Sequence, residues 1–75
     1  MQTSKSIFNK DHKTVVKKLK QARLEIGLNQ KQVASMLRKT QSYVSKIESG
    51  QRRLDVIQLK NFAKIYKKDL GYFIN

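Results

Sequence analysis

Apolar residues recur every three or four positions along most of this 75-residue chain, in segments separated by very short polar stretches. Such spacing places apolar side chains on one face of an α-helix. The chain contains no proline and only three glycines, so its helices need only brief interruptions. A chain of this length holds one domain. We therefore expect an all-α fold, a compact five-helix bundle.

Start and stop signals divide the chain into five predicted helices. Asn29, Thr40 and Asp55 are candidate N-caps, since their side-chain oxygens can accept hydrogen bonds from the first free N–H groups of a helix. Gly27 and Gly50 are placed to end helices. The predicted helices span residues 11–26, 30–37, 41–48, a segment after residue 55 and a short last turn after residue 69. Residues 1–10 are expected to form a flexible basic N-terminal arm, and residues 11–75 the folded domain.

Each predicted helix carries an apolar stripe that is expected to face the core. The stripes comprise Val15, Leu19, Ala22 and Ile26, then Val33, Ala34 and Leu37, then Val44 and Ile47, and finally Val56, Leu59, Phe62, Ala63 and Tyr66. Leu70 and Phe73 are expected to fold back onto this core.

The charge balance restricts the kind of partner. Seventeen lysines and arginines oppose five aspartates and glutamates, which gives a formal net charge of +12 at pH 7. Such an excess points to nucleic acid or to an acidic membrane surface. No segment approaches the ~18 apolar residues of a membrane span, and the N-terminus lacks the apolar region of a secretory signal. We expect a cytoplasmic protein with no membrane partner.

The inventory of reactive side chains argues against an enzyme. The chain has no cysteine and a single histidine, His12, which follows Asp11 near the N-terminus. Its glycines are too far apart for a phosphate-binding loop. We therefore expect no catalytic residue, no metal site and no cofactor.

The segment from Asn29 to Gly50 carries the strongest functional signal. Its two predicted helices are very short, and helices of this length are marginal in isolation. The pair is explained if the first helix braces the second so that the polar face of the second points outward. That is the helix-turn-helix arrangement, whose second helix enters the major groove of duplex DNA.

The polar face of helix 41–48 has side chains suited to this task. Gln41 can form two hydrogen bonds with adenine, and Lys46 can donate to guanine. Ser42 and Ser45 are short, so they allow close approach and can bond to bases or phosphates. The residues expected to contact phosphates around this helix are Gln30, Lys39, Arg52 and Arg53.

Several motifs occur in a characteristic order along residues 15–74. They are Leu19-x-x-x-Arg23, Gly27-Leu28-Asn29-Gln30, Gln32-Val33-Ala34, the segment from Val44 to Gly50, and Leu59-x-x-Phe62-Ala63. In this order they resemble the Cro/C1-type (XRE-like) helix-turn-helix family of phage repressors and bacterial regulators. The resemblance implies a lambda-repressor-like bundle and a bacterial or phage-encoded, nucleoid-associated protein.

The resemblance also implies roles for residues at matching positions. Gln30 corresponds to a glutamine that binds a backbone phosphate. Arg23 and Glu48 correspond to an ion pair that ties the first helix to the end of the third. The positions that read the groove in this family are Thr40, Gln41, Ser42 and Lys46, and the positions in the following loop that touch phosphates are Ser49 and Arg53.

The chain departs from the family pattern in its turns and at one position of the third helix. Arg38 and Lys67 stand where the family usually has glycine, and a side-chain-bearing residue there must accept a positive φ or a different turn. Tyr43 is larger than the residue usual at its site and is expected to pack on the sugar-phosphate edge. A proline common near residues 54–55 is missing.

We therefore expect a sequence-specific double-stranded DNA-binding transcriptional regulator. A repressor is preferred over an activator, binding as a homodimer to a pseudo-palindromic operator, with residues 70–75 as the candidate dimer surface. One alternative is a protein-interaction module, such as an antitoxin-type or adaptor helix-turn-helix protein. Another is a peripheral membrane protein bound through the basic first helix, although the apolar stripe of that helix is needed for the core.

Overall fold

The computed structural model of the chain describes residues 12–74, and this part consists of five α-helices without a strand. The helices are α1 (His12–Ile26), α2 (Gln30–Leu37), α3 (Gln41–Glu48), α4 (Val56–Tyr66) and α5 (Leu70–Ile74). The prediction of an all-α, five-helix fold is therefore confirmed. The arm expected at residues 1–10 and the helix start expected at Asp11 lie outside the described residues.

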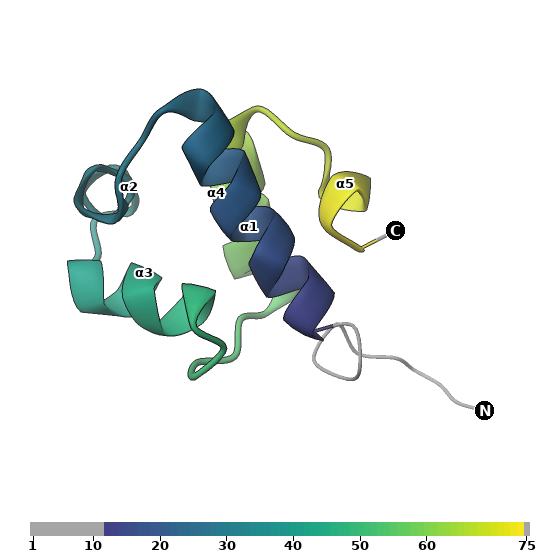
Figure 1. Ribbon diagram of the computed structural model, residues 1–75, viewed down its shortest axis with the longest axis horizontal. Coiled ribbons are helices and arrows are strands. Elements are labelled where there is room, and N and C mark those ends of the chain that lie inside the picture. The colour runs from purple at the N-terminus through teal and green to yellow at the C-terminus, as the bar shows by residue number, and fades with distance from the viewer. Residues whose placement is uncertain (1–11, 75) are drawn as a thin grey trace.

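α1 crosses the middle of the molecule in front of α4 and contacts α3, α4 and α5 (Figure 1). α2 packs mainly against α3, and this pair lies on one side of α1. α5 packs against α1 on the opposite side, next to the C-terminus (Figure 1). This arrangement leaves one side of α3 free of other helices.

Three helices begin with the predicted N-caps. The Asn29 side chain accepts a hydrogen bond from the Gln32 N–H, and the Gln32 side chain accepts one from the Asn29 N–H, both at 2.8 Å. Asp55 and Gln58 form the same reciprocal pair at the start of α4, and Thr40 caps α3. Each cap satisfies N–H groups that a helix leaves unpaired and contributes about 1 kcal/mol. The short helices are therefore bounded by local sequence.

Two turns adopt a left-handed conformation at residues that carry side chains. Arg38 has φ 60° at the end of α2, and Lys67 has φ 57° at the end of α4. In each turn the following N–H bonds back to the last helical turn, from Lys39 to the Ala34 carbonyl at 2.8 Å and from Lys68 to the Ala63 carbonyl at 3.0 Å. The glycine-type turn is thus kept, although L-residues occupy this region at a cost.

The core follows the predicted stripes with two errors at helix ends. Ile26 and Val56 were expected in the core, but 38% and 50% of their surfaces are exposed. Each is the terminal residue of its helix, where the stripe runs beyond the neighbouring helices. The other stripe residues are buried or packed against the buried cluster.

Leu54 is a core residue that the predicted stripes missed. It is 1% exposed and belongs to the same buried cluster as Leu59. Leu54 directly precedes the N-cap Asp55, and Leu59 is the fourth residue of the helix, which are the positions of a hydrophobic staple. That local signal could have identified Leu54.

The apolar face of α1 is buried in the core of the bundle. Val15, Leu19 and Ala22 are each at most 1% exposed. This face is therefore not available to a lipid surface in the folded protein. Within residues 12–74, no helix combines the length and the apolar character needed to cross a membrane.

Lys67→Gly is expected to raise the free energy of unfolding by up to about 1 kcal/mol, because glycine adopts the left-handed conformation without the penalty of a Cβ atom. Lys67→Ala is the matched control, since it removes the same charge but keeps the Cβ atom. Urea denaturation of both variants would measure the difference, and equal changes in the two would contradict a conformational origin.

Candidate nucleic-acid interface

α3 presents a polar face to solvent because its apolar side chains point inward. Val44 and Ile47 are fully buried, whereas Gln41, Ser45 and Lys46 are exposed. The inward pair packs in the core shared with α1, α2 and α4. The exposed face is therefore held at a fixed rotation about the helix axis.

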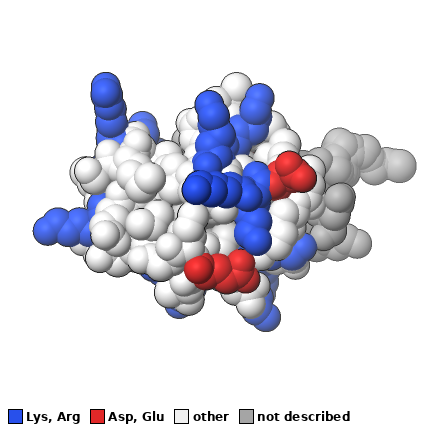
Figure 2. All heavy atoms as spheres, turned by 90° about the horizontal axis from the view of Figure 1, so that it is seen from above, with Lys and Arg blue, Asp and Glu red and all other residues white. Residues whose placement is uncertain are grey.

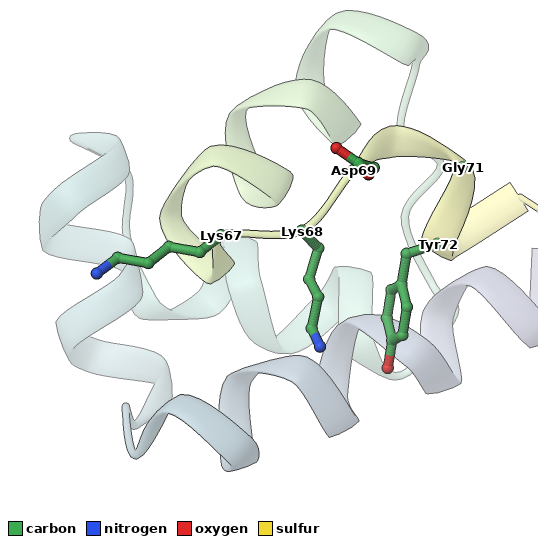
Figure 3. A pocket seen from close by; sticks show the side chains of 5 residues that line it. All are labelled: Lys67, Lys68, Asp69, Gly71 and Tyr72. Carbon is green, nitrogen blue, oxygen red and sulfur yellow. The ribbon is translucent and has the colours of Figure 1, made fainter.

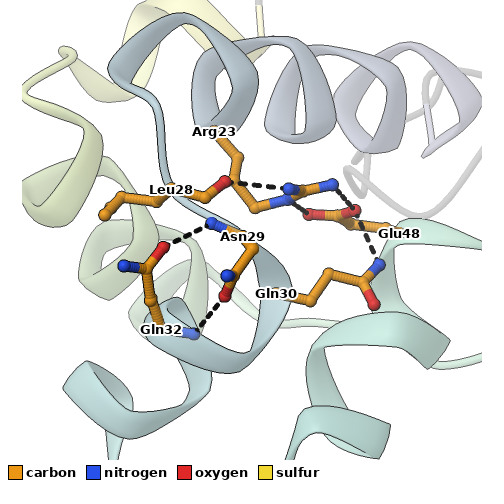
Figure 4. Close-up of polar contacts among 6 residues, drawn as sticks. All are labelled: Arg23, Leu28, Asn29, Gln30, Gln32 and Glu48. Atoms are coloured by element: carbon orange, nitrogen blue, oxygen red, sulfur yellow. Dashed lines mark hydrogen bonds and ion pairs between the residues drawn. The ribbon is translucent and has the colours of Figure 1, made fainter.

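A buried ion pair fixes the end of α3 against α1. Arg23 Nε donates to Glu48 Oε2 at 2.7 Å, and Arg23 Nη2 donates to Glu48 Oε1 at 3.0 Å. The Arg23 and Glu48 side chains are only 8% and 4% exposed. Arg23 Nη1 also donates to the Leu28 carbonyl at 2.9 Å (Figure 4). One guanidinium group thus holds α1, the turn before α2 and the end of α3 together.

Gln30 joins the same network from the first turn of α2. Its Nε2 donates to Glu48 Oε1 at 3.1 Å (Figure 4). The resemblance implied only a phosphate contact for Gln30, and this bond to Glu48 was missed. An amide group carries two N–H donors, so a second donor remains for another acceptor. The bond to Glu48 orients the Gln30 side chain.

Hydrogen bonding and burial, respectively, raise the pKa values of Arg23 and Tyr66 around the ion pair. The hydrogen bonds that Arg23 donates to Glu48 raise the pKa of Arg23 above its ordinary value, against the lowering effect of burial. The nearby Tyr66 hydroxyl is also buried, and burial raises its pKa well above the usual range, with the Glu48 charge acting in the same direction. Tyr66 is therefore neutral at physiological pH, and Arg23 keeps its positive charge beside Glu48.

An open hollow with positive walls runs beside the polar face of α3. Its volume is about 590 Å³. It is lined by Arg38, Lys39, Thr40, Ser42, Tyr43, Lys46 and Arg52. The structure thus brings together six of the predicted DNA-contacting residues, and adds Arg38, which was noted only as a turn residue.

The remaining predicted contact residues lie outside this hollow. Ser49 caps the end of α3, and its hydroxyl donates to the Lys46 carbonyl at 3.1 Å. It borders a second hollow, which α1 lines with Lys13, Lys17 and Lys20. These lysines follow each other at helical spacing, and this periodicity could have indicated that they share one face beside the end of α3.

Positive charge also extends to other faces of the molecule. On the face seen from above in Figure 1, lysine and arginine side chains gather near the centre, with acidic side chains beside them (Figure 2). The excess charge is therefore not confined to α3. It adds a long-range attraction for polyanions to the local contacts.

The hollow between α4 and α5 does not form a convergent site. It is lined by Lys67, Lys68, Asp69, Gly71 and Tyr72. Lys68 Nζ lies 4.5 Å from the centre of the Tyr72 ring, whereas Lys67 and Asp69 point away from this pair (Figure 3). Lys18 Nζ donates to the Tyr72 carbonyl at 2.9 Å. These contacts anchor α5 to the rest of the bundle.

Metal-ligating side chains do not gather in the described part of the chain. Residues 12–74 contain no group of three or more histidine, cysteine, aspartate or glutamate side chains that could hold an ion. The chemistry at α3 is that of hydrogen-bond donors and fixed positive charges.

Comparisons with known proteins agree with this geometry. Residues 19–73 match the Helix-turn-helix family model. One similar solved structure is the restriction-modification controller protein C.AhdI from Aeromonas hydrophila, with 24% sequence identity and a TM-score of 0.76, over 84% of this chain and 96% of that one. No curated protein sequence gives a significant match.

Glu48→Gln is expected to lower the free energy of unfolding by about 3 kcal/mol, because it leaves the Arg23 charge buried without a counter-charge. Glu25→Gln is the matched control. Glu25 is 60% exposed and lies 3.3 Å from Lys68 Nζ, so its loss should cost less than about 1 kcal/mol. Urea denaturation measures both values.

Replacing both buried charges gives an independent check of this reasoning. Arg23→Met combined with Glu48→Leu removes the whole ion pair, so it should recover most of the stability that Glu48→Gln loses. A double variant less stable than Glu48→Gln would contradict the assignment of that loss to an unpaired buried charge.

Proposed function

The chain belongs to the Helix-turn-helix family of Cro/C1 (XRE-like) type, a family of DNA-binding regulators, and on this premise we propose that it is a sequence-specific transcriptional repressor. The exposed face of α3 would enter the major groove of double-stranded DNA. The observation that carries this proposal is the exposure of Gln41, Ser45 and Lys46 on a helix whose apolar face is locked into the core.

Base reading is assigned to polar side chains along that face. Gln41 suits a bidentate contact with adenine, and Lys46 suits the acceptors of guanine. Ser42 and Ser45 are small and let the helix approach the base edges. The residues proposed to contact phosphates are Gln30, Lys39, Ser49, Arg52 and Arg53. Thr40 is proposed to face the groove at the start of α3, and Tyr43 to lie beside the sugar-phosphate edge, where its ring contacts Lys39 and Arg52.

Repression is proposed to work by occupancy of DNA, without a catalytic step. Two copies bound to a pseudo-palindrome would place their α3 helices about 34 Å apart, one turn of DNA. The proposed dimer surface is the C-terminal segment 70–75, where Ile74 is 42% exposed. The similar structure is that of a restriction-modification controller protein, which supports a regulatory assignment.

Selection of bound duplexes from a random pool tests base reading. Gln41→Ala and Lys46→Ala should each relax preference at particular base pairs, with a loss of about 1–3 kcal/mol per contact. Arg53→Ala should weaken binding to all sequences alike, because phosphate contacts carry no sequence information.

Lys60→Ala serves as the control for charge in this experiment, because Lys60 is exposed on α4 and lies outside the proposed contact set. It should leave the selected sequence unchanged. If Lys46→Ala alters the selected sequence no more than Lys60→Ala does, Lys46 does not read bases.

The affinity for duplex DNA should fall steeply with salt. With about six to ten phosphate contacts, the dissociation constant should rise by roughly 10³- to 10⁵-fold between 50 and 200 mM monovalent salt. Fluorescence anisotropy with a labelled duplex measures this dependence. A nearly salt-independent affinity would contradict the proposed phosphate contacts.

A further inference from the structure

Tyr43 is the largest side chain on the outward half of α3, and its ring contacts two cations. Lys39 Nζ lies 5.3 Å from the ring centre, and Arg52 Cζ lies 5.0 Å from it. Both distances are within the ~6 Å range of cation–π attraction. Lys39 precedes α3 and Arg52 follows it, so one ring connects the two ends of the helix.

The ring is itself held in place by the core. Tyr43 lies parallel to Phe62 of α4, with 6.5 Å between ring centres and 5° between ring planes. Phe62 is 1% exposed. Tyr43 is half-buried, and burial raises the pKa of its hydroxyl while the Arg52 charge lowers it. The ring is therefore a fixed, neutral surface.

The backbone on both sides delivers the cations to this surface. The Lys39 N–H donates to the Ala34 carbonyl at 2.8 Å, within the left-handed turn at Arg38. The Arg52 N–H donates to the Lys46 carbonyl at 3.2 Å, so the loop after α3 folds back on the helix. The backbone of Lys39 and Arg52 is thus fixed, and only their flexible side chains remain to be ordered by the ring.

We propose that Tyr43 is a positioning residue that holds Lys39 and Arg52 in place for two DNA phosphates, one at each end of α3. This inference rests on the proposed function. Long lysine and arginine side chains lose rotamer freedom when they bind, and a surface that orders them beforehand reduces that loss. The ring itself need not touch DNA.

The arrangement departs from the family pattern. The resemblance to the family implies a smaller residue at position 43, which would leave no ring between the two basic side chains. Lys39 and Arg52 line the positive hollow together with Tyr43. Tyr43 thus supplies the ring that both basic side chains contact.

The first test uses the protein without DNA. A ring shifts the NMR resonances of protons above its face to higher field. The Lys39 Hε and Arg52 Hδ resonances should be shifted in this way in the wild-type protein and in Tyr43→Phe, and should move to ordinary values in Tyr43→Leu. Unshifted resonances in the wild-type protein would overturn the inference, whether or not the leucine variant folds.

The second test measures binding to duplex DNA in a double-mutant cycle. Tyr43→Leu should weaken binding to selected and to random duplexes by a similar factor, roughly three- to tenfold at low salt. Tyr43→Phe keeps the ring and should stay within about twofold of the wild type. In a protein that already carries Lys39→Gln and Arg52→Gln, Tyr43→Leu should have almost no further effect.

The outcomes of this cycle separate the two proposals. An equal loss from Tyr43→Leu with and without Lys39 and Arg52 would mean a general structural role and would overturn the inference. A loss in Tyr43→Phe as large as that in Tyr43→Leu would also overturn it, because the hydroxyl would then be the contacting group. A wild-type protein that binds no duplex would instead overturn the proposed function, while the resonances of the free protein still report whether the ring holds the cations.

Discussion

The arrangement of the bundle depends on the buried ion pair between Arg23 and Glu48. α3 has only eight residues and buries two large apolar side chains, so packing alone gives it a small area of attachment. The guanidinium group adds directional bonds to the end of α3 and to the Leu28 carbonyl. Buried pairs of this kind contribute little net stability compared with apolar residues, but they define geometry. Gln30 extends the network to α2, so α1, α2 and α3 share one carboxylate.

Features encoded within a few residues were predictable from the sequence. The caps at Asn29, Thr40 and Asp55, the helix boundaries and most of the core follow from local patterns, and the family model confirms the fold. The errors arose where a stripe passes a helix end, as at Ile26 and Val56. Leu54 was missed because a single apolar residue between polar neighbours has no period, although its position before a cap was informative.

The candidate site was less predictable because its contacts join residues that are distant in the sequence. The residue types on the exposed face of α3 were evident from helical spacing. The bond from Gln30 to Glu48 and the contacts of Tyr43 with Lys39 and Arg52 depend on how the turns fold, and no local pattern specifies them. The role of each predicted DNA-contacting residue remains a prediction.

The left-handed turn at Arg38 has two energetic consequences, and only one of them depends on salt. The conformational penalty of a side-chain-bearing residue at φ 60° is the same in any buffer. The attraction of its positive charge for a polyanion, however, is screened over a Debye length of about 8 Å at physiological ionic strength. At low salt, the attraction of Arg38 for a polyanion can offset its conformational penalty. At high salt, the attraction is screened and only the penalty remains.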